Sequence, residues 1–398
     1  MRVAVIGLGA IGAQVLWQLS RVDGVEVHGF DKEYPGHPSA GVGGESRIFW
    51  NLEMTEPAYV PLIERAAVAW RELEASSGQT LRDPTGVLIY GGEQDAQMQC
   101  ALNSAKALEV PVELLETSAL RRRFPHFAFD DHSFGLWDIN GAVIRPERTV
   151  EVTVELARRN GAIVHEFNPV TALDVTGSTV SVLSPSGKQT FDRVVMCCGG
   201  WTSKLVPHIQ DEVVTRRLTS LWFNARQDDF IDLPPFLRTA PQYCYGIPSQ
   251  DRRSIKLGLG FNDHYVTGDA DTLPRQLEGA ELAAELNKFE WIREGMLPWL
   301  SRRPYRVETY VESYTRSMLE YIRPHVENPN VIIMTGFSGH GFRVSPAIGE
   351  IGCQLVVDGK TCVDIGFMER ASPLFSILDP KQGTTTHNSA MASGPSRV

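Results

Sequence analysis

The sequence predicts a mixed α/β fold, in which a parallel-sheet domain is built from separated segments and an antiparallel-sheet domain is inserted between them. Three observations predict it. Residues 1–31 read as a strand, a glycine-rich turn, a helix and a second strand. Residues 217–314 contain short runs in which apolar and polar side chains alternate, as in antiparallel strands. An apolar strand of the buried type returns at residues 331–334, followed by another glycine-rich segment.

The N-terminal segment carries the pattern of a dinucleotide-binding βαβ unit. An apolar strand leads into GLGAIG at residues 7–12, and the second strand ends on Asp31. Gly7 permits the tight turn, Gly9 lets backbone amides approach a pyrophosphate, and Gly12 lets the helix pack closely on the strand. The phosphates would lie at the helix N-terminus, where free amides and the helix dipole favour negative charge. Asp31 can accept hydrogen bonds from a ribose diol, so FAD or NAD is expected rather than NADP.

The remaining elements are expected in a fixed order along the chain. Helical and strand patterns alternate to about residue 140, beginning with a helix at 59–73 and a strand at 85–90. Next come a helix at 147–159 and strands at 162–165, 179–183 and 193–196. The inserted part should hold strands at 218–223, 243–247 and 254–259 and a helical segment at 280–300. After the strand at 331–334, a last helix at 347–357 should begin near Pro346.

Composition narrows the class of protein. The chain has 398 residues, 42% of them hydrophobic and 22% charged, as in globular proteins of two ordinary domains. Its net charge of −10 argues against nucleic-acid or anionic-membrane binding. No apolar run has the roughly 18 residues of a membrane span, and no secretory signal is visible. The six cysteines show neither CxxC nor metal-ligand spacing. We therefore expect a cytoplasmic protein with free thiols and no metal.

Six motifs, taken in order, resemble the monomeric sarcosine oxidase and N-methyltryptophan oxidase family of D-amino-acid-oxidase-like flavoproteins. They are GLGAIG at 7–12, GGESR at 43–47, TGVL at 85–88, CGGW at 198–201 with SKL at 203–205, KLG at 256–258 and GFSGHGF at 336–342. The last is the most specific, and the resemblance covers about residues 1–379. It implies FAD, oxidation of a secondary or tertiary amine by hydride transfer to flavin N5, imine hydrolysis, and reoxidation by oxygen to hydrogen peroxide.

The resemblance also implies a division of the chain. A Rossmann-like FAD-binding domain would comprise residues 1–80, 143–215 and 325–382. The substrate domain, with the antiparallel sheet, would comprise residues 81–142 and 216–324. Residues 383–398 are small and polar and are expected to form a disordered tail. A monomer is expected by the same resemblance.

Three residues or motifs are expected to do the chemistry. Lys256 matches the lysine that lies over the flavin and promotes oxygen reduction, because a fixed cation stabilises the charge that develops on oxygen. Arg47 matches an arginine that adds positive potential near the ring. Amides of Gly339-His340-Gly341 would approach the pyrimidine end of the flavin, and His340 either reacts directly or has a structural role. The full set expected to bind FAD is Gly7, Gly9, Ala10, Ile11, Gly12, Asp31, Lys32, Ser46, Arg47, Val170, Gly199, Trp201, Gly339, His340, Gly341, Phe342 and Arg343.

The expected substrate site departs from the family pattern. Arg343 takes the place of a lysine that binds the substrate carboxylate, and Tyr245 and Tyr314 match aromatic residues of the pocket. Trp50 replaces a second carboxylate-binding arginine, and Gly260 replaces a pocket histidine. These changes favour a larger, more apolar amine, with at most one carboxylate, over a small N-methyl amino acid.

The residue at the expected point of flavin attachment also differs from the family pattern. Glu312 stands where the family's covalent flavin cysteine would be, and a glutamate cannot form that thioether. We therefore expect non-covalent FAD, with attachment through a histidine such as His37 left open. Four other functions also stay open: a flavin dehydrogenase that uses an electron carrier, a flavin oxidase of a C–O or C–C bond, a catalytically idle FAD-binding protein, and, less favoured, a nicotinamide dehydrogenase.

Overall fold

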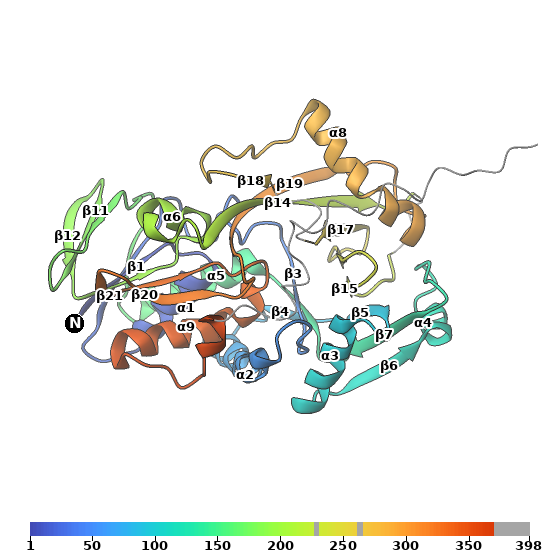
Figure 1. Ribbon diagram of the computed structural model, residues 1–398, viewed down its shortest axis with the longest axis horizontal. Coiled ribbons are helices and arrows are strands. Elements are labelled where there is room, and N and C mark those ends of the chain that lie inside the picture. The colour runs from blue at the N-terminus through green and yellow to red at the C-terminus, as the bar shows by residue number, and fades with distance from the viewer. Residues whose placement is uncertain (227–230, 261–265, 370–398) are drawn as a thin grey trace, which may run out of the picture.

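The computed structural model describes residues 1–226, 231–260 and 266–369 (Figure 1). The expected tail at 383–398 lies outside the described residues. Two large sheets organise the described part. One is parallel and lies with its helices at the left of Figure 1, and the other is antiparallel and extends to the right. No helix in these ranges is long and apolar enough to cross a bilayer.

The parallel sheet has the strand order β20-β21-β13-β1-β2-β9. Within the described residues all of its strands run parallel except β20, which pairs antiparallel with β21. The bounds are β1 (Arg2–Ile6), β2 (Glu26–Phe30), β9 (Ile163–His165), β13 (Arg193–Met196), β20 (Tyr321–His325) and β21 (Asn328–Thr335). Strand β1 thus lies between β2 and β13. A crevice opens at the carboxyl ends of these three strands.

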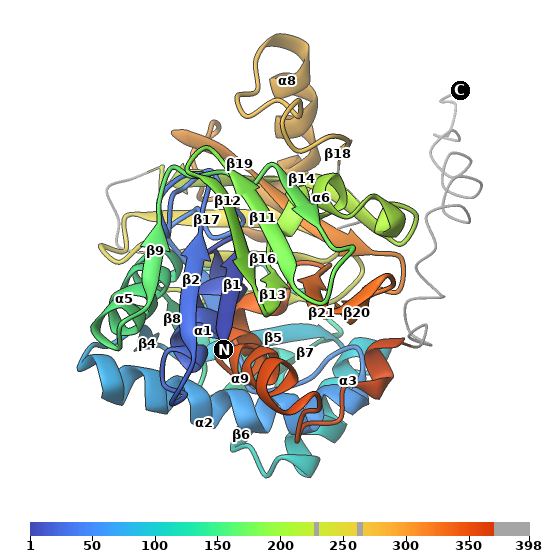
Figure 2. The same ribbon diagram turned by 90° about the vertical axis from the view of Figure 1, so that its left-hand side faces the viewer.

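Both faces of the parallel sheet are covered (Figure 2). In β1, Val3 and Val5 pack against a helical layer, whereas Ala4 and Ile6 pack against a small antiparallel sheet, as the two-residue period of a strand requires. The helical layer comprises α1 (Ala10–Leu19), α2 (Val60–Ser77), α5 (Pro146–Arg159) and α9 (Gly341–Asp358). The small sheet comprises β10 (Ala172–Asp174), β11 (Val180–Ser184) and β12 (Gly187–Phe191).

The second sheet, antiparallel except where β15 pairs parallel with β5, follows the order β18-β14-β17-β16-β15-β5-β7-β6, and β19 also pairs with β14. Its strands are β5 (Val87–Gly92), β6 (Val112–Glu116), β7 (Ser133–Asp138), β14 (Val213–Asn224), β15 (Phe236–Arg238), β16 (Cys244–Pro248), β17 (Ser254–Leu259), β18 (Val266–Thr267) and β19 (Arg306–Thr315). The helices around it are α3 (Ala96–Ala107), α4 (Thr117–Arg123) and α8 (Gly279–Lys288). The long strands β14 and β19 reach back toward the parallel sheet (Figure 1).

Short elements join the two sheets. A further small sheet pairs β3 (Arg47–Phe49) and β4 (Arg82–Pro84) with β8 (Ala142–Ile144). The other short elements are η1 (Pro57–Tyr59), η2 (Gly199–Trp201), α6 (Thr202–Leu205), η3 (Pro207–Ile209), η4 (Ile292–Met296) and η5 (Gly366–Glu369). The residue ranges expected for the two domains stay a prediction. The parallel sheet takes its strands from residues 2–30, 163–196 and 321–335.

Two expected helices differ from those observed. The segment at 280–300 is not one helix, because α8 ends at Lys288 and a single π-helical turn, η4, follows. Gly295 lies in that turn, and Pro298 beyond it cannot extend a helix. The last helix begins at Gly341 rather than near Pro346, which lies inside it. A proline near the start of a helix removes only a small part of the hydrogen-bond ladder. The last two residues of GFSGHGF, Gly341 and Phe342, are the first residues of α9.

Candidate active site

The first cavity has a volume of about 500 Å³ and lies at the carboxyl ends of β1, β2 and β13. Most residues expected to bind FAD line it: Gly7, Gly9, Ala10, Ile11, Asp31, Lys32, Arg47, Val170, Gly199, Trp201, Gly339, Gly341 and Phe342. Gly12 and Ser46 do not line it, and His340 and Arg343 line a neighbouring cavity instead. His37, left open above as a point of attachment, also lines the first cavity, as do Cys197 and Cys198, which were not expected there.

The turn after β1 is shaped to receive phosphates. Gly7 has φ of +87°, and a Cβ there would lie 2.5 Å from the carbonyl oxygen of Cys197. A Cβ on Gly9 would meet no atom of the described residues within 4 Å, so its backbone faces open space in the cavity. Helix α1 follows with no side-chain cap and no acid in its first turn in the described chain, which leaves its amides free for an anion.

Asp31 lies where a ribose would meet the end of β2. Its Oδ2 accepts a hydrogen bond from Leu8 N at 2.7 Å and its Oδ1 one from Glu33 N at 3.0 Å. The carboxylate is therefore fixed, and its remaining lone pairs can accept the hydroxyls of a diol. The cavity thus fits an adenine dinucleotide at the helix N-terminus and at the acid.

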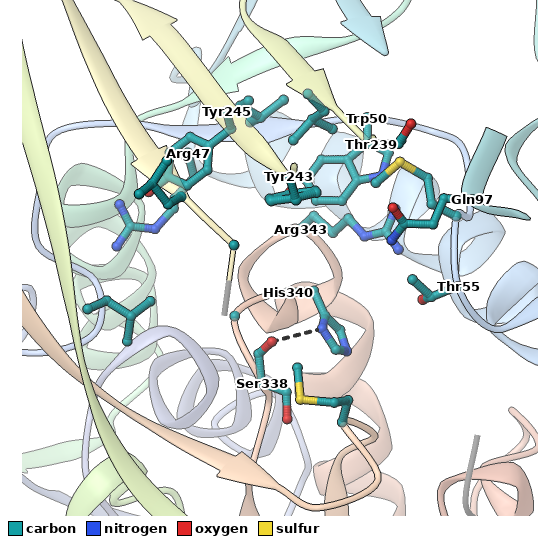
Figure 3. A pocket seen from close by; sticks show the side chains of 18 of the residues that line it. Arg47, Trp50, Thr55, Gln97, Thr239, Tyr243, Tyr245, Ser338, His340 and Arg343 are labelled. Carbon is teal, nitrogen blue, oxygen red and sulfur yellow. Dashed lines mark hydrogen bonds between the residues drawn. The ribbon is translucent and has the colours of Figure 1, made fainter. Parts of the chain in front are cut away.

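The second cavity has a volume of about 580 Å³ and lies between GFSGHGF and the antiparallel sheet (Figure 3). Arg47, Glu312, Gly339 and Phe342 line both cavities, so the two meet at these residues. A flavin ring that reached this junction would face the second cavity. We therefore treat the second cavity as the candidate substrate pocket.

Lys256, on β17, lines the second cavity and is 1% exposed. Its Nζ donates to Gly44 O at 2.9 Å and to Ser46 O at 3.1 Å. A Cβ on Gly44 (φ +100°) would lie 3.0 Å from Nζ and 2.4 Å from the hydroxyl of Tyr310, so only glycine admits this contact. Burial, with repulsion from Arg47, holds the pKa of Lys256 well below its ordinary value.

Arg47 is held by the loop that precedes it. Its guanidinium donates to Ser46 O at 2.8 Å and to the carbonyls of Gly41 and Gly43 at 2.7 Å each. In the described residues these contacts are with carbonyls, so Arg47 keeps an unneutralised positive charge where the two cavities meet. Glu312 faces the same junction. Burial raises its pKa, which Arg47 partly opposes.

His340 lines the second cavity, but both ring nitrogens face protein atoms. Nδ1 lies 3.2 Å from Ser338 O (dashed in Figure 3), and Nε2 lies 2.9 Å from the Tyr59 hydroxyl and 3.4 Å from Glu320 Oε1. The Tyr59 hydroxyl also donates to Glu320, which is 1% exposed. The imidazole is thereby fixed in orientation at the N-terminus of α9.

Arg343 lies at the far side of the second cavity from Arg47 (Figure 3). Its guanidinium donates to Leu52 O at 2.7 Å and forms a buried ion pair with Glu53. The Trp50 ring lies 4.3 Å from the guanidinium carbon. The residue expected to bind a substrate carboxylate therefore already has a carboxylate partner within the protein.

The other residues expected in the substrate pocket also line the second cavity: Trp50, Tyr245, Gly260 and Tyr314. A Cβ on Gly260 would lie 3.0 Å from Cβ of Tyr243, so a larger side chain there would displace that tyrosine. Sequence reasoning missed Tyr243, Glu53 and Glu320. An acid in a polar segment looks exposed in sequence, and no spacing pattern marks these two acids as buried.

Comparison with known proteins assigns the family. Residues 2–355 match the sequence model of the DAO family, described as FAD dependent oxidoreductase. The chain belongs to this family. It is therefore an FAD-dependent oxidoreductase, as the motifs predicted.

Relatives of this FAD-dependent oxidoreductase cover nearly its whole length. Monomeric sarcosine oxidase of Streptomyces avermitilis is 29% identical over 378 residues, 92% of this chain and 96% of that protein. N-methyl-L-tryptophan oxidase of Yersinia pestis is 27% identical over 368 residues, 91% of this chain and 96% of that protein.

Solved structures show the same fold. NikD, described as an unusual amino acid oxidase essential for nikkomycin biosynthesis, matches in its open form with a TM-score of 0.77 and 19% identity, over 94% of this chain and 98% of that one. L-proline dehydrogenase from P. horikoshii matches with a TM-score of 0.76 and 19% identity, over 92% of this chain and 96% of that one.

Proposed function

We propose that this FAD-dependent oxidoreductase oxidises the C–N bond of a secondary or tertiary amine and transfers the electrons to oxygen, forming hydrogen peroxide. The two curated relatives named above are oxidases of N-methylated amino acids by name. One observation carries the oxygen part of the proposal: Lys256 is buried in the wall of the second cavity, near Arg47 of the junction. FAD, when bound, accepts electrons from the substrate and passes them to oxygen.

The protein's own groups would divide the work. Arg47 and Lys256 supply positive potential at the junction, which favours the negative charge that develops on reduction. Trp50, Tyr243 and Tyr245 wall the second cavity with aromatic surface (Figure 3), which suits a bulky, apolar amine. The amine must be neutral to react, because its nitrogen lone pair assists cleavage of the adjacent C–H bond. Water then hydrolyses the imine to a carbonyl compound and a smaller amine.

Lys256→Met separates the two halves of this reaction. We expect reoxidation of the reduced enzyme by oxygen to slow about 100-fold, as when one fixed stabilising group is removed. Flavin reduction by an amine under anaerobic conditions should change little. Stopped-flow absorbance measures each step. The matched control is Lys188→Met, because Lys188 is an exposed residue of β12 paired with Asp174. Equal reoxidation rates in wild type and Lys256→Met would refute the assignment of the oxygen site.

A dehydrogenase is the second candidate, and the contacts of Lys256 favour it in one respect. Its Nζ donates to two carbonyls, Gly44 O and Ser46 O, which competes with contact to oxygen. A dehydrogenase would reduce an artificial electron acceptor quickly and oxygen slowly, with no effect of Lys256→Met on the oxygen step.

Product analysis tests the alternative of a flavin oxidase that acts on a C–O or C–C bond. A carbonyl compound without released amine would indicate oxidation of such a bond.

We also propose that the enzyme acts as a monomer in the cytoplasm. All six cysteines lie in the described part of the chain and are free thiols, which fits a reducing compartment. Light scattering coupled to gel filtration should give the mass of one 44.1 kDa chain. A dimer mass would refute the monomer.

A further inference from the structure

We propose that Glu53 acts as a built-in counter-ion for Arg343, so that the substrate pocket selects amines with an uncharged polar group at this end and rejects those with a carboxylate. This inference rests on the proposed function and names the substrate class for that pocket. The expectation of a carboxylate anchor at Arg343 is replaced by the opposite preference.

The positive charge of Arg343 already has a partner within the protein. The side chain is 5% exposed, one terminal nitrogen donates to Leu52 O, and the other is paired with Glu53. Trp50 covers the face of the guanidinium. The Nε atom is buried and has no hydrogen-bond partner among the described residues. A substrate carboxylate therefore finds both terminal nitrogens of this cation engaged and one of its faces covered by Trp50.

Glu53 is held as firmly as its partner. It is 2% exposed, and its Oε1 accepts from Thr55 Oγ1 at 2.6 Å, Thr55 N at 2.8 Å and Glu56 N at 3.1 Å. Burial alone would raise the pKa of Glu53. Arg343 and these donors outweigh burial and leave the pKa below its ordinary value. The glutamate is thus a charged, preorganised carboxylate.

The balance of charge at this end of the pocket then opposes a second anion. Asp95 lines the same cavity and accepts a hydrogen bond from Gly92 N at 2.7 Å. A substrate carboxylate would add a third acid to Glu53 and Asp95 in the cavity wall that holds Arg343. Like charges in a buried site raise the free energy of the charged state, and an unbalanced buried charge is costly. Arg47 and Lys256 lie at the other end (Arg47 in Figure 3) and would not offset it.

Neutral hydrogen-bonding groups surround the same end. Thr55, Gln97 and Thr239 line the cavity beside Arg343 (Figure 3). The Gln97 amide can both donate and accept, and the Thr55 hydroxyl, which donates to Glu53, can still accept. An amide, ester, ketone or hydroxyl substituent on the amine can therefore be satisfied here without adding charge.

A pair of unreactive ligands tests the inference on the oxidised holoenzyme. Phenylacetamide and phenylacetate have the same shape but differ in charge, and neither carries an oxidisable amine. Calorimetry and the change in flavin absorbance give their dissociation constants. We expect wild type to bind phenylacetamide at least about tenfold more tightly than phenylacetate. Equal or tighter binding of phenylacetate would overturn the inference.

Glu53→Gln tests the counter-ion directly. It keeps the shape of the side chain and removes the charge, so Arg343 becomes uncompensated. The affinity for phenylacetate should rise at least about tenfold, while that for phenylacetamide changes little. The matched control is Glu56→Gln, whose carboxylate accepts from Ala58 N and does not contact Arg343. A phenylacetate affinity unchanged by Glu53→Gln contradicts the inference, and if this variant does not fold, the comparison in wild type decides.

The test is independent of turnover. A holoenzyme that no amine reduces would count against the proposed function and leave these binding constants unaffected. Tight binding of phenylacetate by an enzyme that does oxidise amines would count against the role of Glu53 alone.

Discussion

At the scale of single residues, Lys256 makes the pH dependence of the enzyme informative. Its pKa lies well below the ordinary value because the ammonium group is buried near Arg47. A lysine is charged below its pKa and neutral above it, so lowering the pH restores the cation. If that cation assists oxygen reduction, the rate constant of reoxidation should rise as the pH falls. The same measurement on Lys256→Met should give a flat profile, and a rise of equal size in both proteins would exclude Lys256 as its source.

Glu312 decides how the flavin is held. It lines both cavities, and its carboxyl group cannot form a thioether. We expect acid precipitation of the purified enzyme to release all of the flavin into the supernatant, where its absorbance is measured. The variant Glu312→Cys is the complementary test, since it restores the side chain that the resemblance associates with attachment, and part of its flavin should stay in the pellet. Flavin retained in the wild-type pellet would show a different covalent link, with His37 as the first residue to replace.

At the scale of elements, the N-terminus of α9 is joined to β20 and η1 by two buried side chains and one partly buried side chain. Tyr59 is the last residue of η1, Glu320 directly precedes β20, and His340 directly precedes α9. The Tyr59 hydroxyl donates to Glu320, and the imidazole of His340 contacts both. The position of a glycine-rich segment beside the flavin site thus depends on a polar contact inside the core.

Tyr59→Phe measures that contact. Removing the hydroxyl leaves a buried carboxylate with one donor fewer, which should lower the free energy of unfolding by about 1–3 kcal/mol. Denaturant unfolding of the holoenzyme gives the value. Tyr34→Phe is the matched control, because the ring of Tyr34 is 45% exposed, and its effect should be below about 0.5 kcal/mol. Equal losses in the two variants would mean that the contact contributes no stability.

Elements differ in how far the sequence predicts them, for physical reasons. β13 was predicted at its observed bounds, residues 193–196, because an apolar run that ends at glycines has few alternatives. The GLGAIG turn was predicted because its chemistry is local. The start of α9 was misplaced because Gly341 and Pro346 have poor helix propensity, and tertiary contacts outweigh it there.

The site residues divide in the same way. Lys256, Arg47 and Trp50 lie in motifs or at positions that a resemblance can mark, and the structure brings them to one cavity. Glu53 could not be predicted as the partner of Arg343, because 290 residues separate the two and pairing at that range depends on the fold. The ligand that we propose for this end of the pocket differs from the expected carboxylate for that reason.

At the scale of the whole molecule, a segment of turns and bends at residues 268–277 follows β18 of the antiparallel sheet and reaches the first cavity. Asp271 lines that cavity, accepts from Trp201 Nε1 at 2.6 Å and pairs with Lys204. Arg275 in the same segment donates to Ser39 O at 3.2 Å. Segments far apart in sequence therefore close over the cofactor site together, and the retention of FAD should depend on their contact.

Asp271→Asn tests whether this segment helps to retain FAD. The carboxylate is 53% exposed, so its pair with Lys204 should contribute no more than an exposed ion pair does. We expect the dissociation constant of FAD to rise about two- to fivefold, which corresponds to roughly 0.4–1 kcal/mol. Added salt should weaken FAD binding more in wild type than in Asp271→Asn, because screening removes an attraction that the variant already lacks. Asp174→Asn breaks the exposed pair with Lys188 on β12 and serves as the control. If both variants bind FAD with the same affinity and salt dependence, the segment at 268–277 covers the cavity without holding the cofactor, and retention must then come from the βαβ turn and Asp31.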